Sequence, residues 1–154
     1  MSEPGENEKV ESILTDVTGI WGLVGMERQY DIMFAENGIA FTVVASGLKM
    51  AARAAGVQFG VVGAVATGAL TGNKNVRKQF EGLTLREILN LNEKSFYVPY
   101  ASVKQVSVKK GTLVAKMNFE LPDGRFRCQF SKGQIETAQQ AVFARLAAKV
   151  TDRE

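Results

Sequence analysis

Apolar and polar residues alternate along much of the second half of the chain, and this pattern predicts β-strands. The longest run, residues 113–121, places five apolar side chains on one side of a strand and polar ones on the other. Shorter alternating runs predict strands at 95–100, 106–109 and 126–130. A tight turn is expected at residues 122–124, because proline fixes its own φ and the following Asp-Gly accepts the turn conformation.

The first half of the chain shows two further patterns. Residues 29–34 and 39–44 alternate and flank an Asn-Gly pair, which predicts a β-hairpin. Apolar residues at helical spacing predict a short helix near 8–18; they are Val10, Ile13, Leu14 and Val17. Residues 1–9 are polar and include proline and glycine, so they are expected to form a flexible tail.

Capping signals predict two helices after residue 80. Thr84 and Glu87 have the spacing of a capping box ahead of a short helix at 84–92. Ser131 and Gln134 repeat that spacing ahead of a longer amphipathic helix at 133–150. The apolar face of this second helix contains Ile135, Ala138, Val142, Leu146 and Val150.

Small residues recur every four positions in an uncharged segment between these regions. They are Gly56, Gly60, Ala64, Gly68 and Gly72, whereas Phe59 and Val62 fall on other sides of a helical wheel. With Gly63 the segment contains five glycines, and a helix with five glycines loses roughly 4–5 kcal/mol in water relative to alanine, so it needs a close partner. Residues 50–72 are therefore interpreted as a glycine-zipper insertion that packs on the domain, on a second copy or on a membrane surface. A glycine-rich loop is the other interpretation.

A helix that spans a membrane is disfavoured for this segment. The nineteen uncharged residues just reach the necessary length. A span would, however, place the flanking strands on opposite sides of the bilayer, although one sheet is expected to draw strands from both sides of the insertion.

The C-terminal pattern resembles bacterial pleckstrin-homology-like (GRAM-like) domains. The resemblance rests on residues 96–100 (FYVPY), Val103, Val106, the turn at 109–111, the long strand, the Asp-Gly hairpin and the closing helix. It implies an α+β fold: a bent antiparallel sheet, close to a barrel, with a C-terminal helix over one end. It also implies binding of lipid headgroups or protein partners, without catalysis. A single domain, 1–154, with the insertion inside it, is expected.

Composition excludes several chemistries. The chain contains no histidine, so a Ser/His/Asp triad, a Cys/His pair and a Cys/His zinc site are all impossible within it. No metal site and no cofactor are predicted. With one cysteine, Cys128, no internal disulfide is possible. Cys128 alternates with Phe126 and Phe130 on the apolar side of its predicted strand, so it is expected in the core. The N-terminus does not resemble a signal peptide, so a cytoplasmic location is expected, with peripheral membrane association as an extension.

Charge is divided unevenly along the chain. Residues 1–48 contain two basic and eight acidic side chains, whereas residues 49–154 contain seventeen basic and eight acidic ones. This division indicates either an anionic partner for the C-terminal part or charge matching between the two parts.

Two groups of basic residues are candidates for contact with an anionic surface. The first group flanks the glycine segment and consists of Lys49, Arg53, Lys74, Arg77 and Lys78. The second lies on or near the predicted strands and consists of Lys104, Lys109, Lys110, Lys116, Arg125, Arg127 and Lys132. Alternation places Lys116, Arg125 and Arg127 on the outward side of neighbouring strands.

The sequence is best interpreted as a non-catalytic binding or assembly module. It is expected to self-associate as a homo-oligomer, or to dock on an anionic membrane surface, through the glycine-zipper segment; a protein partner is a further option. The alternatives are an enzyme that uses carboxylates such as Asp31 or Asp123, and a domain that binds anionic ligands or nucleic acid. Nucleic acid is disfavoured because aromatic residues are not interleaved with the basic ones.

Overall fold

The computed structural model describes residues 3–22, 25–44, 80 and 82–151, which form an α+β structure. The strands are β1 (Val10–Trp21), β2 (Arg28–Ala35), β3 (Gly38–Val43), β4 (Phe96–Pro99), β5 (Gln105–Lys110), β6 (Val114–Leu121) and β7 (Gly124–Ser131). The helices are α2 (Leu85–Leu89) and α3 (Ile135–Leu146), with short 3-10 turns η3 (Tyr100–Ser102), η4 (Lys132–Gln134) and η5 (Ala147–Lys149).

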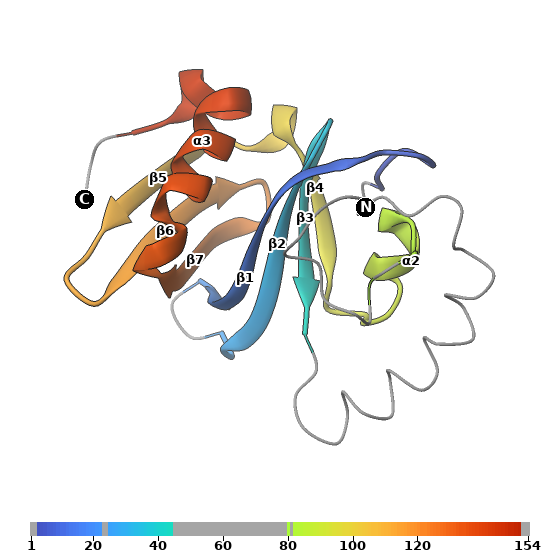
Figure 1. Cartoon of the computed structure of the whole chain (residues 1–154), viewed down its shortest axis with the longest axis horizontal. Coiled ribbons are helices and arrows are strands. Elements are labelled where there is room, and N and C mark those ends of the chain that lie inside the picture. Colours follow the sequence, from blue (N-terminus) through green and yellow to red (C-terminus); the bar gives the residue numbers. More distant parts are fainter. Residues whose placement is uncertain (1–2, 23–24, 45–79, 81, 152–154) are drawn as a thin grey trace.

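The seven strands form one bent antiparallel sheet with the order β4-β3-β2-β1-β7-β6-β5 (Figure 1). The long strand β1 joins the two halves, because it pairs with β2 along its length and with β7 through its last residues, Thr18 to Trp21. The edge strands β4 and β5 share no ladder within the described residues, so the sheet is not closed. Beyond η5 the chain returns to β5, where the Thr151 amide donates to the Val106 carbonyl at 2.9 Å.

The concave side of the sheet holds the main core, which is rich in aromatic rings. Phe126 lies at its centre, with ring centroids of Phe41, Tyr30 and Trp21 at 5.0, 5.2 and 5.4 Å. Helix α3 covers this core and packs against β1 and β5. Its buried residues are Ile135, Ala138, Ala141, Val142 and Leu146.

A second, smaller core lies on the other side of β1 to β4, so β2 and β3 are buried on both faces. Helix α2 contributes Leu85 and Ile88 to it, and the sheet contributes residues such as Met33 and Tyr97. The helix begins as the sequence predicts, because Thr84 and Glu87 make both hydrogen bonds of a capping box.

The helix predicted near residues 8–18 is wrong, because this segment is strand β1. Its apolar residues have helical spacing because the pairing with β2 is interrupted twice, between Val10 and Ser12 and between Leu14 and Val17. An extra residue in a strand changes which face the following side chains occupy. Leu14 and Val17 therefore both enter the main core although they are three residues apart.

The remaining strand and helix predictions agree with the structure, with two corrections. The hairpin of β2 and β3 and the strands β4 to β7 occur where alternation places them. Residues 95–130 are expected to form three consecutive antiparallel strands, but they hold four: β4 pairs with β3, and only β5, β6 and β7 form a consecutive meander. The capping box predicted at Ser131 is also wrong: Ser131 makes no side-chain cap and Gln134 precedes the helix. The predicted glycine-zipper segment, residues 50–72, lies outside the described residues.

The segment before β1 makes specific contacts that its composition did not indicate. Glu8 is buried and its carboxylate accepts hydrogen bonds from the Tyr97 hydroxyl at 2.8 Å and from the Asn37 amide at 2.7 Å. The side chain also accepts a hydrogen bond from the Gly5 amide at 2.9 Å. These bonds attach the chain around Glu8 to the hairpin turn of β2 and β3.

Candidate functional site

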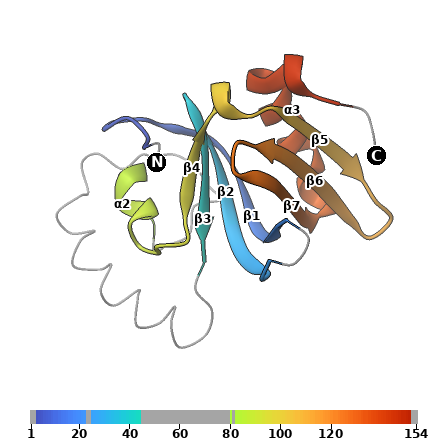
Figure 2. The same ribbon diagram turned by 180° about the vertical axis from the view of Figure 1, so that it is seen from behind.

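Alternation on β6 and β7 gives the sheet a polar face on the side opposite the main core. Met117 and Phe126 point inward and are buried, whereas Lys116, Asn118 and Arg125 point outward. Figure 2 shows this side of the molecule, with β5 to β7 in front of α3. We call the outward side chains of β5, β6, β7 and the end of β1 the outer face.

The strand register arranges the outer face in three rows. Each row joins one residue of β5, one of β6 and one of β7. The rows are Lys109, Lys116 and Gln129; Ser107, Asn118 and Arg127; and Gln105, Glu120 and Arg125. The β5 and β7 members of each row, such as Gln105 and Arg125, are 20 residues apart in the sequence and are brought into one row by the register.

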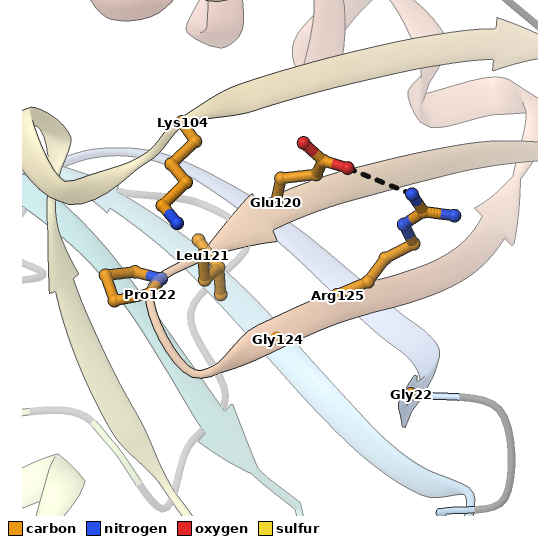
Figure 3. A pocket seen from close by; sticks show the side chains of 7 residues that line it. All are labelled: Gly22, Lys104, Glu120, Leu121, Pro122, Gly124 and Arg125. Atoms are coloured by element: carbon orange, nitrogen blue, oxygen red, sulfur yellow. Dashed lines mark hydrogen bonds and ion pairs between the residues drawn. The ribbon is translucent and has the colours of Figure 1, made fainter.

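Three adjoining hollows cover the outer face. The first, about 500 Å³, is lined by Lys104, Glu120 and Arg125 together with the turn residues around Pro122 (Figure 3). The second, of similar volume, shares Glu120 and Arg125 with the first and reaches Arg127. The third, about 380 Å³, shares Asn118 and Arg127 with the second and extends to Lys116, Glu27 and strand β1.

Basic side chains outnumber acidic ones around these hollows. The basic residues are Lys104, Lys116, Arg125 and Arg127, and the acidic ones are Glu27 and Glu120. Figure 3 shows Lys104 and Arg125 on either side of Glu120, and Arg125 donates to this carboxylate at 2.9 Å. Because both partners are well exposed, this ion pair contributes only about 0.2–1 kcal/mol. A competing anion therefore displaces it at little cost.

Arg127 lies at the junction of the second and third hollows. One of its Nη2 hydrogens is donated to the Gly22 carbonyl at 2.9 Å, while its Nε is buried and makes no hydrogen bond to the described residues. A guanidinium carries five N–H donors, so these contacts leave donors for a ligand. A buried donor without a partner costs about 1–3 kcal/mol, which a rearrangement around a bound anion can recover.

Like charges face one another at one end of the outer face. Lys109 of β5 lies directly opposite Lys116 of β6 in the antiparallel ladder. Like charges directly opposite one another are unfavourable in a sheet. The outer face is thus suited to binding phosphate or carboxylate groups.

The structure agrees with the sequence on three of the basic candidates, because Lys116, Arg125 and Arg127 all lie on the outer face. The sequence did not indicate Asn118 and Glu120 as members of the site. Their alternation with apolar residues was visible, but only the register shows that they lie opposite Arg127 and Arg125. Four further basic candidates, Lys104, Lys109, Lys110 and Lys132, are also described and exposed. The candidates of the glycine segment and its flanks lie outside the described residues: Lys49, Arg53, Lys74, Arg77 and Lys78, and Gly56, Phe59, Gly60, Val62, Ala64, Gly68 and Gly72.

The two carboxylates considered for catalysis have different surroundings. Asp31 is buried in β2 and accepts a hydrogen bond from the Asp16 amide at 3.2 Å. Asp123 is exposed in the turn between β6 and β7. Neither is part of a cluster, since the described residues hold no group of three or more Asp, Glu or Cys side chains arranged for a metal ion.

Burial raises the pKa of several groups further above neutral pH. It raises the pKa of the Cys128 thiol, which is buried and donates to the Met117 carbonyl. It also raises the pKa values of Tyr97 and Tyr100, with the Glu8 carboxylate adding to the effect at Tyr97. These groups are neutral and unreactive near pH 7, as the predicted core position of Cys128 implies.

Charge matching between the two parts of the chain is also visible. Arg145 of α3 forms an ion pair with Glu11 of β1 at 2.5 Å, and Arg86 of α2 lies 3.6 Å from Glu3. Both pairs are partly exposed, so each contributes little to stability. Neither includes a basic residue of the outer face.

No protein-family model and no curated protein matches this sequence. Among the described helices, none has the length and apolar character needed to cross a bilayer.

Proposed function

We propose that the protein is a non-catalytic binding module of pleckstrin-homology-like architecture that recognises an anionic partner on its outer face. The strand order supports the architecture. Two meanders, β1 to β4 and β5 to β7, meet through β1 and β7, and a C-terminal helix packs between β1 and β5. Binding modules of this kind use a rigid sheet to position polar side chains.

The observation that carries the proposal is the continuity of the three hollows, because the second shares Glu120 and Arg125 with the first and Asn118 and Arg127 with the third. Four basic side chains line them, from β6, β7 and the segment before β5, with Asn118 as a neutral hydrogen-bonding partner. Charge-assisted hydrogen bonds from arginine to phosphate or carboxylate are about twice as strong as neutral ones. Asp31 is buried in β2 whereas Asp123 is exposed in a turn, so the two carboxylates do not share one environment. This favours a binding module over a carboxylate-dependent enzyme.

Titration with inorganic pyrophosphate tests the proposal. Backbone amide chemical shifts should change at residues 105–109, 116–120 and 125–129, and the change should weaken at high salt. Arg125→Gln and Lys116→Gln should each reduce the affinity about threefold to tenfold. The matched control is Lys94→Gln, because Lys94 is exposed between α2 and β4 and touches none of the hollows. Equal losses in all three variants would contradict an outer-face site.

Association through residues 50–72 is a second candidate function, supported by the four-residue spacing of Gly56, Gly60, Ala64, Gly68 and Gly72. We propose that this segment is a helical insertion whose small residues pack against another backbone. Gly60→Leu and Gly68→Leu should then reduce the oligomer mass in light scattering, whereas Val62→Leu should preserve it. Unchanged mass in both glycine variants would leave the spacing without a role in assembly.

A further inference from the structure

The hairpin turn between β5 and β6 presents an apolar side chain to solvent. Leu113 is 85% exposed, more than any other large hydrophobic side chain of the described residues. The turn is compact, since the Gly111 amide donates to the Val114 carbonyl at 2.9 Å. A Cβ atom at Gly111 would lie 2.5 Å from that oxygen, so the turn requires glycine. Leu113 is thus held outward by a defined turn. We call residues 109–116 the hairpin tip.

Lysines surround Leu113. Lys109, Lys110 and Lys116 belong to the hairpin tip itself and are exposed. Lys132, at the start of η4, donates to the Thr112 carbonyl at 3.0 Å and adds a fourth positive charge. The sequence contains no Asp or Glu at 109–117, and the first acidic residue after Lys132 is the exposed Glu136. The acidic side chain that shares a hollow with Lys116 is Glu27, on the β1 side of the outer face.

The hairpin tip protrudes from the molecule. In Figures 1 and 2 the loop joining β5 and β6 extends beyond the rest of the sheet, at the end remote from α2. A flat surface can therefore contact Leu113 and its lysines without meeting the bulk of the described structure.

We infer that the hairpin tip is a docking site for an anionic lipid bilayer, with Leu113 inserted at the interface and the four lysines near the headgroups. Transfer of an exposed leucine out of water is favourable, and lysines are attracted to the negative surface potential of an anionic bilayer. The two effects reinforce one another only at a surface that is both apolar beneath and anionic above. This inference goes beyond the proposed function: it concerns the hairpin tip, which shares Lys109 and Lys116 with one end of the outer face, and it commits to a bilayer as the partner.

The expected binding is weak and reversible. Each lysine near an anionic surface increases the binding constant about fivefold. Insertion of one leucine adds about a further tenfold. Two such signals are required for useful membrane binding, and neither is sufficient alone. Binding should therefore decrease when either the leucine or the lysines are replaced, and when the salt concentration is raised.

A tryptophan at the tip gives a local test with the full chain. The variant Leu113→Trp is prepared together with Trp21→Phe, so that the only indole is at the hairpin tip. Its emission should shift to the blue with vesicles of phosphatidylcholine and phosphatidylserine, and brominated acyl chains should quench it. Vesicles of phosphatidylcholine alone should produce little change. No spectral change with the anionic vesicles would overturn the inference.

Sedimentation with the same vesicles gives a second test. Leu113→Asp should reduce the bound fraction about tenfold or more, and Lys109→Gln with Lys110→Gln about 25-fold. Phe143→Ser is the matched control, because Phe143 is also exposed (57%) but lies on α3. Unaltered sedimentation of Leu113→Asp would overturn the inference. Pyrophosphate binding measured on Leu113→Asp should remain normal, so the result does not depend on the outer-face proposal.

Discussion

The side-chain amide of Gln134 is paired with the backbone of Thr15 by two hydrogen bonds. Its Oε1 accepts from the Thr15 amide at 2.8 Å, and its Nε2 donates to the Thr15 carbonyl at 2.8 Å. Thr15 lies where β1 bulges away from the ladder with β2, so it has no opposite residue there. Gln134 therefore takes the place of a neighbouring strand and joins the bulge to the start of α3.

Replacing Gln134 with alanine should destabilise the fold by about 1–3 kcal/mol, because two backbone groups lose their partners in a partly buried place. The stability of Gln134→Glu should lie between those of the wild type and Gln134→Ala, since a carboxylate still accepts from the Thr15 amide but cannot donate to the Thr15 carbonyl. Urea denaturation measures both. Gln139→Ala, at an exposed position of the same helix, is the control and should be neutral or slightly stabilising. An equal loss at Gln139 would indicate a helix effect and not the bulge contact.

The bond between Glu8 and Tyr97 should appear as a coupling in a double-mutant cycle. Glu8→Gln and Tyr97→Phe each remove part of a buried, charge-assisted hydrogen bond, so the two effects should not add. We expect a coupling free energy of about 1–3 kcal/mol from denaturation curves. Glu6→Gln, at an exposed position, should show no coupling to Tyr97→Phe. Additive effects of Glu8→Gln and Tyr97→Phe would mean that the contact contributes nothing specific.

Gly19 should not tolerate even a methyl group. A Cβ atom there would lie 2.4 Å from Cζ of Phe126 and 2.9 Å from Cε1 of Tyr30, both in the packed main core. Gly19→Ala is expected to cost about 1–3 kcal/mol through overpacking. Gly133→Ala is the matched control, because a Cβ atom at Gly133 would meet nothing within 4 Å. Thermal unfolding of both variants should give a lower melting temperature for Gly19→Ala than for Gly133→Ala. Similar melting temperatures would contradict the packing argument.

The Cys128 thiol should be unreactive in the folded protein. Burial raises the pKa of this thiol, so the reactive thiolate is scarce, and the sulfur lies within the main core. At pH 8, a disulfide reagent such as Ellman's reagent should react only after urea is added. The unfolded chain is the positive control for a competent thiol. Rapid labelling without denaturant would show that the strand around Cys128 opens readily.

Stability should decline in alkaline solution. The pKa of Tyr97 is raised in the folded state by burial and by the Glu8 carboxylate, whereas the unfolded tyrosine titrates near its ordinary value. A raised folded pKa means that its contribution is complete below about pH 10 and is lost as the pH rises further. Denaturation curves between pH 8 and 11 should show this loss. Tyr97→Phe should make the decline shallower, and an identical slope in that variant would assign the effect to other groups.

Local patterns were sufficient to predict several elements. The alternation of residues 113–121 and 126–130 predicted β6 and β7 and the outward direction of Lys116, Arg125 and Arg127. The Thr84 and Glu87 spacing predicted α2. These patterns act within a few residues, so side-chain parity and helix capping are visible in the sequence itself.

Strand β1 shows why other features were not predictable. Its bulges give Leu14 and Val17 the spacing of a helix, and the bulge is tolerated because partners distant in sequence satisfy its backbone. Those partners are the Gln134 amide for Thr15 and the Asp31 carboxylate for Asp16. The apparent capping box at Ser131 fails for the same reason, since Gln134 bonds to the backbone of β1 and contacts Ser131 only through its hydroxyl, at 3.4 Å.

The sequence by itself therefore determined the α+β class, the strands of the C-terminal meander, the two helices and which basic residues face outward. Only the tertiary structure decided the strand order, the β1 bulge, the pairing of Asn118 with Arg127, and the protrusion of Leu113 among lysines contributed by β5, β6 and η4. The physical reason is the range of the interactions. Alternation and capping depend on neighbours along the chain, whereas register, bulges and surface clusters depend on residues that folding brings together from distant positions.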